Sequence, residues 1–311
     1  MPIEPGVNKL APNVAQGGAQ MVRPVRAREL QDPLNLYLYH PLSWQLARRL
    51  APTPITPNMV SVFGGLCVVA AAFAYAQQAW PVSAALGMLL HMAWHVVDGA
   101  DGDLARMTGR TSPIGELVDG LCDYLSHVAL YLVLGWMLSS AIGSAAWWWM
   151  LAAGISHIVQ ANHVEVQRRS YQWWVFGTPW LRNTHAAAGS ATAKSGVGGL
   201  VSAYLALASG MTPHALRIDA ATAAAQGDPV RLEAIRSAVR AEAPPLLLLC
   251  KLLGPNPRAI VLGLAMLAAG HSGQGPLWFF LYQTIALNLL LVVSVMMHNA
   301  AAKRIAARIG A

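Results

Sequence analysis

Four aspartates fall within one short stretch of the chain, 98–123, which reads DGADGDLARMTGRTSPIGELVDGLCD. On helices, Asp98 and Asp101 share one face because they are three residues apart, and Asp119 and Asp123 share another because they are four apart. A carboxylate at the centre of a membrane helix costs roughly 2.5–3.5 kcal/mol on insertion scales. An apolar chain keeps four of them only if their charge is offset, so the stretch predicts a cation site or a sodium or proton pathway.

Carboxylate oxygens are hard ligands, and they favour Mg²⁺, Mn²⁺ or Ca²⁺ over softer metals. The short segment TGRTSP would make the two helices that carry the aspartates antiparallel neighbours, with Pro113 in the first turn of the second helix. All four carboxylates would then meet at one end of the pair. Two metal ions about 3.5–4 Å apart could clamp a diphosphate there. We therefore expect Mg²⁺ or Mn²⁺ as the cofactor, with two ions bound.

The residues around the aspartates favour a ligand site over an ion pathway. Gly102, Ala105 and Gly115 are small and would let a flat group come close to the backbone. Arg106 supplies a fixed positive charge that suits phosphate. An ion pathway has no need of this pattern. Asp103 interrupts it, and we expect this aspartate to face water.

In residue order and spacing, the stretch resembles the whole signature of the CDP-alcohol phosphotransferase (CDP-alcohol phosphatidyltransferase) family. The segment ITPNMVS (55–61) also resembles that family's entry to its first membrane helix. Eight fixed positions at fixed gaps are far more specific than a single glycine-rich loop. The matching positions are Asp98, Asp101, Gly102, Ala105, Arg106, Gly115, Asp119 and Asp123.

The resemblance implies an enzyme of phospholipid synthesis. Such an enzyme transfers a phosphatidyl or other substituted phosphoryl group from a CDP-linked donor, usually CDP-diacylglycerol, to a small alcohol and releases CMP. It also implies a homodimer, four metal-holding aspartates, and Asp123 as the general base toward the acceptor hydroxyl. The residues that would contact the CDP moiety are Asp98, Asp101, Gly102, Ala105, Arg106, Gly115, Asp119 and Asn58.

Polar residues near the same ends of other helices are candidates for the acceptor pocket. These candidates are His163, Glu165, Arg168, Lys251 and Arg258. A phosphorylated acceptor would need at least two of the cations, whereas a choline-like acceptor would need Glu165 and an aromatic face such as that of Trp173. The sequence leaves this choice open. Each cation could instead be an anchor at the membrane edge.

The elements that must position these residues are membrane helices. The chain has 311 residues, of which 55% are hydrophobic and 11% charged, whereas soluble domains carry about 25% charged residues. No Asp, Glu, Lys or Arg occurs in 51–97, 124–164 or 259–302. A crossing needs about 20 residues. These windows indicate six spans, near 58–78, 82–107, 113–138, 145–168, 256–273 and 277–302.

The connections between the predicted spans sort by charge. AQQAWP, SSAIGSA and HSGQG carry no Lys or Arg, whereas the opposite helix ends carry cations such as Arg48, Arg110, Arg168 and Lys303. Positive residues mark the cytoplasmic side. We therefore expect a multi-pass protein of the cytoplasmic (inner) membrane, with both termini and the aspartates facing the cytoplasm. Membrane lipids are expected partners, and a nucleic acid is not.

The predicted fold is all-α, with a membrane domain over 29–311 that follows a flexible polar arm over 1–28. The segment 33–50 is predicted to be an amphipathic helix on the membrane surface, with a solvated connector as the alternative. The segment 170–245 is predicted to be a cytoplasmic or interfacial insertion between the fourth and fifth spans.

Two other functions remain open. One is a transferase whose donor and acceptor are both water-soluble, such as CDP-inositol with inositol phosphate. The other is an ion-coupled transporter that uses the same carboxylates. Release of CMP would distinguish either transferase from the transporter.

Overall fold

A computed structural model describes residues 27–77, 79–180, 206 and 210–311. Over these residues the fold is all-helical, as predicted, and no strand occurs. The elements, in chain order, are η1 (Arg28–Leu30), η2 (Asn35–Tyr39), α1 (His40–Leu50), α2 (Pro57–Tyr75), α3 (Val82–Thr108), α4 (Pro113–Ile142), α5 (Ala145–Phe176), α8 (Ala215–Ala224), α9 (Pro229–Leu252), α10 (Pro255–Ala269), η4 (Gly270–Ser272), α11 (Gly275–Leu281), η5 (Tyr282–Ala286) and α12 (Leu287–Ile309).

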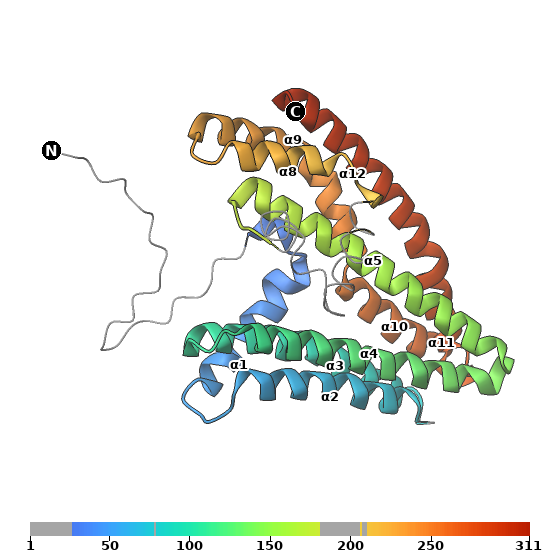
Figure 1. Cartoon of the computed structure of the whole chain (residues 1–311). Coiled ribbons are helices and arrows are strands. Elements are labelled where there is room, and N and C mark those ends of the chain that lie inside the picture. Colours follow the sequence, from blue (N-terminus) through green and yellow to red (C-terminus); the bar gives the residue numbers. More distant parts are fainter. Residues whose placement is uncertain (1–26, 78, 181–205, 207–209) are drawn as a thin grey trace, which may run out of the picture.

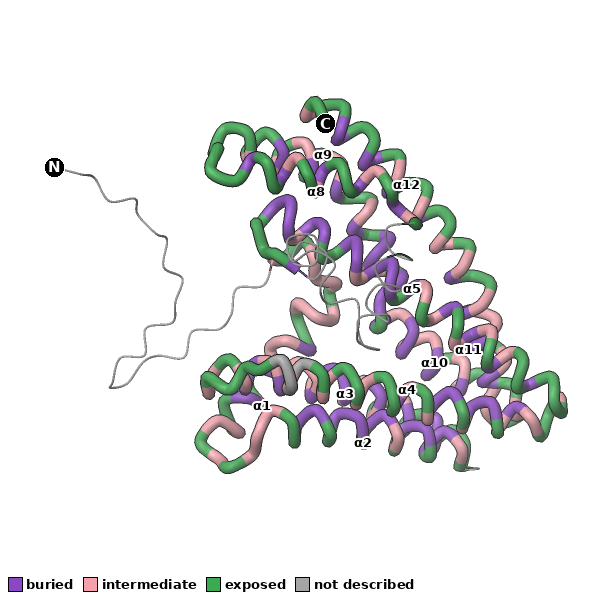
Figure 2. The backbone as a smooth tube through the Cα atoms, viewed as in Figure 1, coloured by how far each residue is buried: buried purple, intermediate pink, exposed green. Residues whose placement is uncertain are grey.

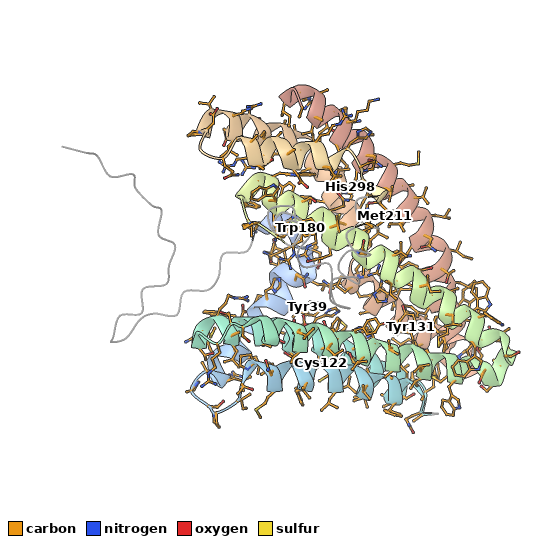
Figure 3. The ribbon with its side chains drawn as sticks, viewed as in Figure 1. Tyr39, Cys122, Tyr131, Trp180, Met211 and His298 are labelled. Atoms are coloured by element: carbon orange, nitrogen blue, oxygen red, sulfur yellow. The ribbon has the colours of Figure 1, made fainter. Side chains whose placement is uncertain are left out.

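The helices form two groups that meet at one end and diverge toward the other (Figure 1). Helices α1 to α4 make the lower group, and α5 and α8 to α12 make the upper group. At the end where they meet, α4 packs against α5 and α11, and α3 packs against α10. The segment 27–50 crosses from one group to the other at the open end. Tyr39 lies in this crossing segment (Figure 3).

Three helices begin with the same local signal, a polar N-cap residue followed by a proline. The caps of α2, α4 and α9 are Thr56, Ser112 and Asp228. In α4, the Ser112 hydroxyl accepts a hydrogen bond from the N–H of Gly115 at 3.0 Å, which satisfies a backbone donor that the helix leaves free. Because α4 begins at Pro113, as predicted, Asp119 and Asp123 fall in its second and third turns.

Gly99 sets the distance between α1 and the helix that carries the first aspartates. A Cβ atom at Gly99 would stand 2.6 Å from Ser43 Oγ, so a side chain there would push α1 away. The Ser43 hydroxyl lies 2.8 Å from the carbonyl oxygens of both Tyr39 and Val96, and it thereby bridges the crossing segment and α3. The glycine next to Asp98 therefore keeps α1 directly on the aspartate helix.

Buried residues (Figure 2) form one core that the two groups share and a second core within the upper group. The larger core fills the end where the groups meet, and Tyr75, Leu134 and Phe280 are among its members. A second core joins α8 and α9 to α5 and α12, where the Trp174 indole N–H donates to Asp219 at 2.7 Å. Helices α8 and α9 are therefore packed parts of the upper group.

Four helical segments among the described residues are long and apolar enough to cross a membrane: Pro57–Tyr75, Leu117–Ile142, Pro229–Ser272 and Gly275–Ile309. They overlap the predicted first, third, fifth and sixth spans. The other two predicted spans lie within the continuous helices α3 and α5. Those two helices are not among the four, and both carry histidines and charged residues. Six crossings therefore remain a prediction.

The two predicted peripheral segments differ in outcome. The segment 33–50 is helical and exposes Tyr37 and Leu42, and its place on a membrane surface remains a prediction. Both ends of the predicted insertion 170–245 fall inside helices, because α5 continues to Phe176 and α9 already begins at Pro229. The glycine-, alanine- and serine-rich part of the insertion and residues 1–26 of the arm lie outside the described residues.

Candidate active site

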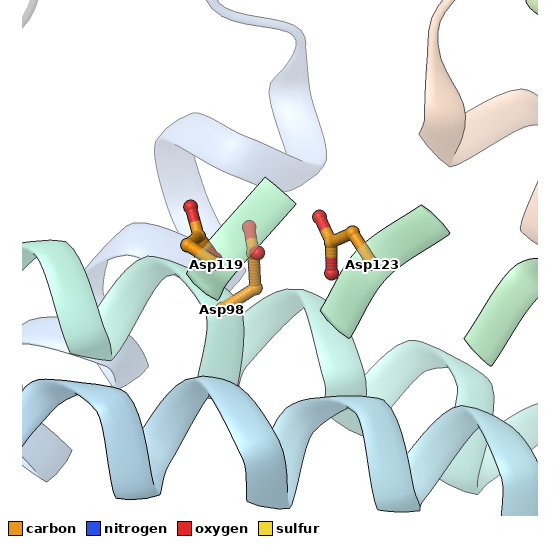
Figure 4. A group of neighbouring side chains, drawn as sticks. All are labelled: Asp98, Asp119 and Asp123. Carbon is orange, nitrogen blue, oxygen red and sulfur yellow. The ribbon is translucent and has the colours of Figure 1, made fainter. Parts of the chain in front are cut away.

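Three of the four motif aspartates come together at one end of the α3–α4 pair. Asp98 on α3 and Asp119 and Asp123 on α4 each offer a carboxylate oxygen, and these oxygens lie within 4.8 Å of one another. Figure 4 shows the three carboxylates beside each other on the same side of the helix pair. No other group of His, Cys, Asp or Glu in the described parts of the chain meets this spacing. Three hard oxygen donors at this spacing fit a divalent cation.

Asp101 lies beside this group, with its two oxygens already engaged. The Ser61 hydroxyl of α2 donates to Asp101 Oδ2 at 2.6 Å, and the backbone N–H of Gly102 donates to Oδ1. The side chain is buried and adjoins Asp119. Asp101 is therefore held by α2 next to the cluster, and direct ligation of a metal by Asp101 remains a prediction.

Arg106 folds back over its own helix. Its Nη2 lies 2.6 Å from Asp103 Oδ1, three residues earlier. Asp103 is only 2% exposed, so the expectation that it faces water is wrong, and the arginine three residues later is the physical reason. A Cβ atom at Gly102 would stand 3.3 Å from Arg106 Nη2, so the glycine makes room for the guanidinium.

The other predicted contacts of a CDP moiety lie around the start of α4. A Cβ atom at Gly115 would stand 3.5 Å from Asn58 Oδ1, so the first turns of α2 and α4 are adjacent. Ala105 is half-buried on α3. The structure thus gathers the predicted small and polar residues at the same end of α2, α3 and α4 as the aspartates.

A cavity of about 1050 Å³ lies between the two helix groups, and two of the three clustered aspartates, Asp98 and Asp123, line it. Ligand sites typically measure about 300–1,000 Å³, so this one can hold a large ligand. Asp98, Asp123 and Arg106 line it from the lower group, and the segment 27–40 contributes a further wall. Four predicted acceptor residues line it from the upper group: Glu165, Arg168, Lys251 and Arg258.

The charged residues of the upper wall differ in their partners. Glu165 accepts from Arg169 Nε at 2.6 Å and lies 3.5 Å from Arg168 Nη1, so its charge is already compensated. Lys251 and Arg258 have no ion-pair partner among the residues that the structure describes. The upper wall therefore presents two cations that no carboxylate of the described part of the chain neutralises.

Arg258 is a buried cation held by amides. Its side chain is 5% exposed, and its Nη2 donates to Gln160 Oε1 at 3.1 Å. Gln160 is fixed in turn by Gln283, which donates to the same oxygen at 2.6 Å. The Nε atom of Arg258 is buried and has no hydrogen-bond partner among the residues that the structure places. A buried charge needs compensation, so this arginine is suited to an anionic ligand in the cavity.

His163 is placed apart from the other acceptor candidates. It is fully buried, and its Nε2 lies 2.9 Å from Ser294 Oγ on α12. Its ring meets that of His298 edge-on at 5.2 Å. His163 is not among the residues that line the cavity, so the structure places it between α5 and α12.

Sequence reasoning missed two contributors to the site. Trp94, one helical turn before Asp98, donates its indole N–H to Asp123 Oδ1 at 2.8 Å. Asp32, in the crossing segment, accepts from Asn256 Nδ2 of α10 at 2.8 Å and lines the cavity. The position of Trp94 on the aspartate face of its helix was a signal for the first contact. No sequence signal pairs residues as far apart as Asp32 and Asn256.

Tyr39 closes the crossing segment against the aspartate helix. Its ring stacks on that of His95, with 4.9 Å between the centroids, and His95 lines the cavity. Burial, together with the charge of Asp32, raises the pKa of Tyr39 to about 12. The hydroxyl therefore stays neutral at physiological pH, and this wall of the cavity carries no phenolate charge.

Comparison with known proteins gives one family and several distant relatives. Residues 54–213 match the profile of the CDP-alcohol phosphatidyltransferase family. Ethanolaminephosphotransferase 1 of Pongo abelii is 33% identical over 111 residues, which are 31% of this chain and 28% of that protein. Cholinephosphotransferase 1 of Homo sapiens is 30% identical over 135 residues, which are 42% of this chain and 32% of that protein.

A plant protein shows the same degree of likeness. Choline/ethanolaminephosphotransferase 1 of Arabidopsis thaliana is 30% identical over 131 residues, which are 39% of this chain and 32% of that protein. The chain thus spans less than a third of the length of these three relatives. No solved structure matches the chain.

Proposed function

Because this chain belongs to the CDP-alcohol phosphatidyltransferase family, we propose that it transfers a substituted phosphoryl group from a CDP-linked donor to an alcohol and releases CMP. The product class places the reaction in phospholipid synthesis. One observation carries the proposal: three carboxylate oxygens lie within 4.8 Å of one another, and two of the residues that offer them, Asp98 and Asp123, line a cavity. The opposite wall of this cavity holds Lys251 and Arg258, which have no carboxylate partner among the described residues. That arrangement suits a substrate that brings both a diphosphate and a second polar group.

The aspartate cluster fits Mg²⁺ or Mn²⁺ because its donors are all carboxylate oxygens. Asp98, Asp119 and Asp123 would hold two ions, with Asp101 beside them. When bound, the ions offset the charge of the donor's diphosphate and of the CMP that leaves. Arg106 lines the same wall, and its guanidinium, which Asp103 holds in place, would contribute hydrogen-bond donors toward the diphosphate.

Asp123 is the residue that we assign as general base. Its carboxylate takes the proton of the acceptor hydroxyl, and the hydroxyl oxygen bonds to the phosphorus atom of the transferred group. The bond between that phosphorus and the oxygen of CMP breaks, and CMP leaves with the electron pair. The Trp94 hydrogen bond and the half-buried position of Asp123 support this role, since both hold the carboxylate at the cavity wall.

The acceptor that the upper wall suits best carries an anionic group. Lys251 and Arg258 lack carboxylate partners among the described residues, and Arg258 is buried with a free Nε. Glu165, which a choline-like acceptor would need, is already paired with Arg169. We therefore favour a phosphorylated small alcohol, with Arg168 as a third cation of the pocket.

The donor proposed from the sequence is CDP-diacylglycerol. The relatives are named for the transfer of ethanolamine or choline phosphate, which makes CDP-ethanolamine and CDP-choline the second donors to test. We further propose that the protein resides in the cytoplasmic (inner) membrane, with its site facing the cytoplasm. We also propose that the protein forms a homodimer, as the family resemblance implies.

The test is release of CMP by the purified protein in lipid vesicles. CDP-diacylglycerol, CDP-ethanolamine, CDP-choline and CDP-inositol are each supplied with Mg²⁺ and a panel of free and phosphorylated alcohols. We expect CMP with CDP-diacylglycerol and a phosphorylated alcohol, and none after chelation with EDTA. CMP only from CDP-inositol would favour two water-soluble substrates. Absence of CMP from every pair, together with ion flux across the vesicles, would show a transporter instead.

A further inference from the structure

Trp94 is a buried donor in contact with the proposed base. Its side chain is 6% exposed, and its indole Nε1–H donates to Oδ1 of Asp123 with 2.8 Å between the two atoms. The contact joins α3 to α4 at the end where the aspartates meet. An indole N–H can only donate, so Asp123 must present this oxygen as an acceptor.

Packing fixes the direction of the indole N–H. The ring of His95 lies 4.4 Å from that of Trp94, and the ring of His127 meets it edge-on at 4.6 Å. Behind it, a Cβ atom at Gly64 of α2 would stand 3.5 Å from Trp94 Cδ1, so α2 backs the ring. Three helices therefore hold the ring, and the position of its N–H does not depend on a flexible side chain.

The hydrogen bond acts on a carboxylate that its neighbours repel. Asp98 and Asp119 place oxygens within 4.8 Å of an oxygen of Asp123, and like charges at such distances push one another apart. A hydrogen bond to an ionised carboxylate is about twice as strong as one between neutral groups. Trp94 therefore opposes rotation of the Asp123 side chain away from the cluster.

We propose that Trp94 is a positioning residue for the transfer reaction. Its N–H fixes the side-chain rotamer of Asp123 through Oδ1 and leaves Oδ2 to accept the proton of the acceptor hydroxyl. The inference rests on the proposed function, because it names the partner of the base in that reaction. Asp98 and Asp119 remain to hold the donor through its metal ions, so loss of the N–H slows turnover with little effect on donor binding.

The test is Trp94→Phe, which keeps an aromatic ring and removes the N–H. We expect kcat to fall about tenfold to a hundredfold, the range for a lost hydrogen bond to a charged group. The KM for the CDP-linked donor should stay within about threefold. In an Asp123→Asn background, Trp94→Phe should cause no further loss. Trp148→Phe is the matched control, because the Trp148 side chain is 73% exposed and lies outside the cavity wall.

A spectroscopic measurement checks the contact without activity. Ultraviolet resonance Raman difference spectra between the wild type and Trp94→Phe should show a hydrogen-bonded indole N–H. The same difference in an Asp123→Ala background should show a free one. A hydrogen-bonded signal in both backgrounds would overturn the proposal.

The kinetic outcomes separate this inference from the proposed function. Wild-type protein that releases no CMP from any donor would refute the function itself. Active wild type together with an unchanged kcat in Trp94→Phe would refute only the positioning role. A raised donor KM with an unchanged kcat would also refute it, and would make Trp94 a wall of the donor site.

Discussion

The role of general base that we propose for Asp123 can be tested by removing its ability to accept a proton. Asp123→Asn preserves size and hydrogen bonding to Trp94 but cannot take a proton from a hydroxyl. We expect CMP release to fall about 10²- to 10⁴-fold, while labelled donor still binds because Asp98 and Asp119 remain. Asp228→Asn is the control, since asparagine caps a helix as well as aspartate does. Wild-type turnover in Asp123→Asn would remove this residue from the base role.

Arg258 should decide which acceptors are used. Arg258→Gln keeps a polar side chain beside Gln160 and removes the buried charge. We expect the KM for a phosphorylated acceptor to rise about tenfold to a hundredfold, with a much smaller change for an uncharged alcohol. Arg49→Gln, on the exposed side of α1, should change neither value. Equal effects on charged and uncharged acceptors would show that Arg258 supports the fold and does not select the acceptor.

Residue spacing predicted four aspartates in one cluster, and the structure brings three of them together, with Asp101 beside them. Positions three and four apart share a face of a helix, so two antiparallel helices can bring such positions together at one end. Spacing alone cannot identify the neighbour that a side chain meets. His163 is next to the predicted acceptor residues in the chain, yet it faces α12 because one position on a helix turns a side chain by about 100°. Asp103 is buried because the Arg106 side chain folds back onto it. The pattern of small residues around the motif does not predict this ion pair.

At the scale of elements, the contact between α1 and α3 depends on Gly99, which has no side chain to separate the two helices. Gly99→Ala would place a methyl carbon 2.6 Å from Ser43 Oγ. We expect a loss of about 1–3 kcal/mol in the free energy of unfolding, as for other overpacked contacts, seen as a lower thermal midpoint in detergent.

Gly120→Ala is the matched control for this contact. Gly120 lies in α4, and a Cβ atom there would meet nothing within 4 Å. Alanine favours a helix interior over glycine by roughly 0.5–1 kcal/mol, so the midpoint should rise slightly. A midpoint for Gly99→Ala at or above that of the wild type would show that α1 shifts freely on α3.

Charge-free windows allowed most membrane helices to be predicted from the sequence, and Pro113 predicted the start of α4. The prolines after Thr56, Ser112 and Asp228 mark helix starts in the structure. The extent of the insertion was harder to predict, since α9 carries charged residues in its first half and an apolar run in its second. Packing against α5 and α12 makes these two halves one helix, and packing is not visible in composition.

At the scale of the whole molecule, the charged helix ends and the site should lie on one side of the membrane. An even number of crossings, four or six, puts both termini together. We expect epitope tags on both ends to be accessible in inside-out vesicles and protected in right-side-out ones. A tag in the uncharged turn at Gly143 should show the opposite pattern. Termini that label from opposite sides would contradict the proposed topology.

The hydrogen bond from Asn256 to Asp32 joins residues that are 224 positions apart. During synthesis, the aspartates of α3 and α4 leave the ribosome well before α10 exists to hold the crossing segment. We therefore expect a nascent chain that stops before Asn256 to carry the full aspartate motif beside an incomplete cavity, which is open to water and does not retain a substrate. We therefore expect the cavity to gain its last wall only when α10 has been made.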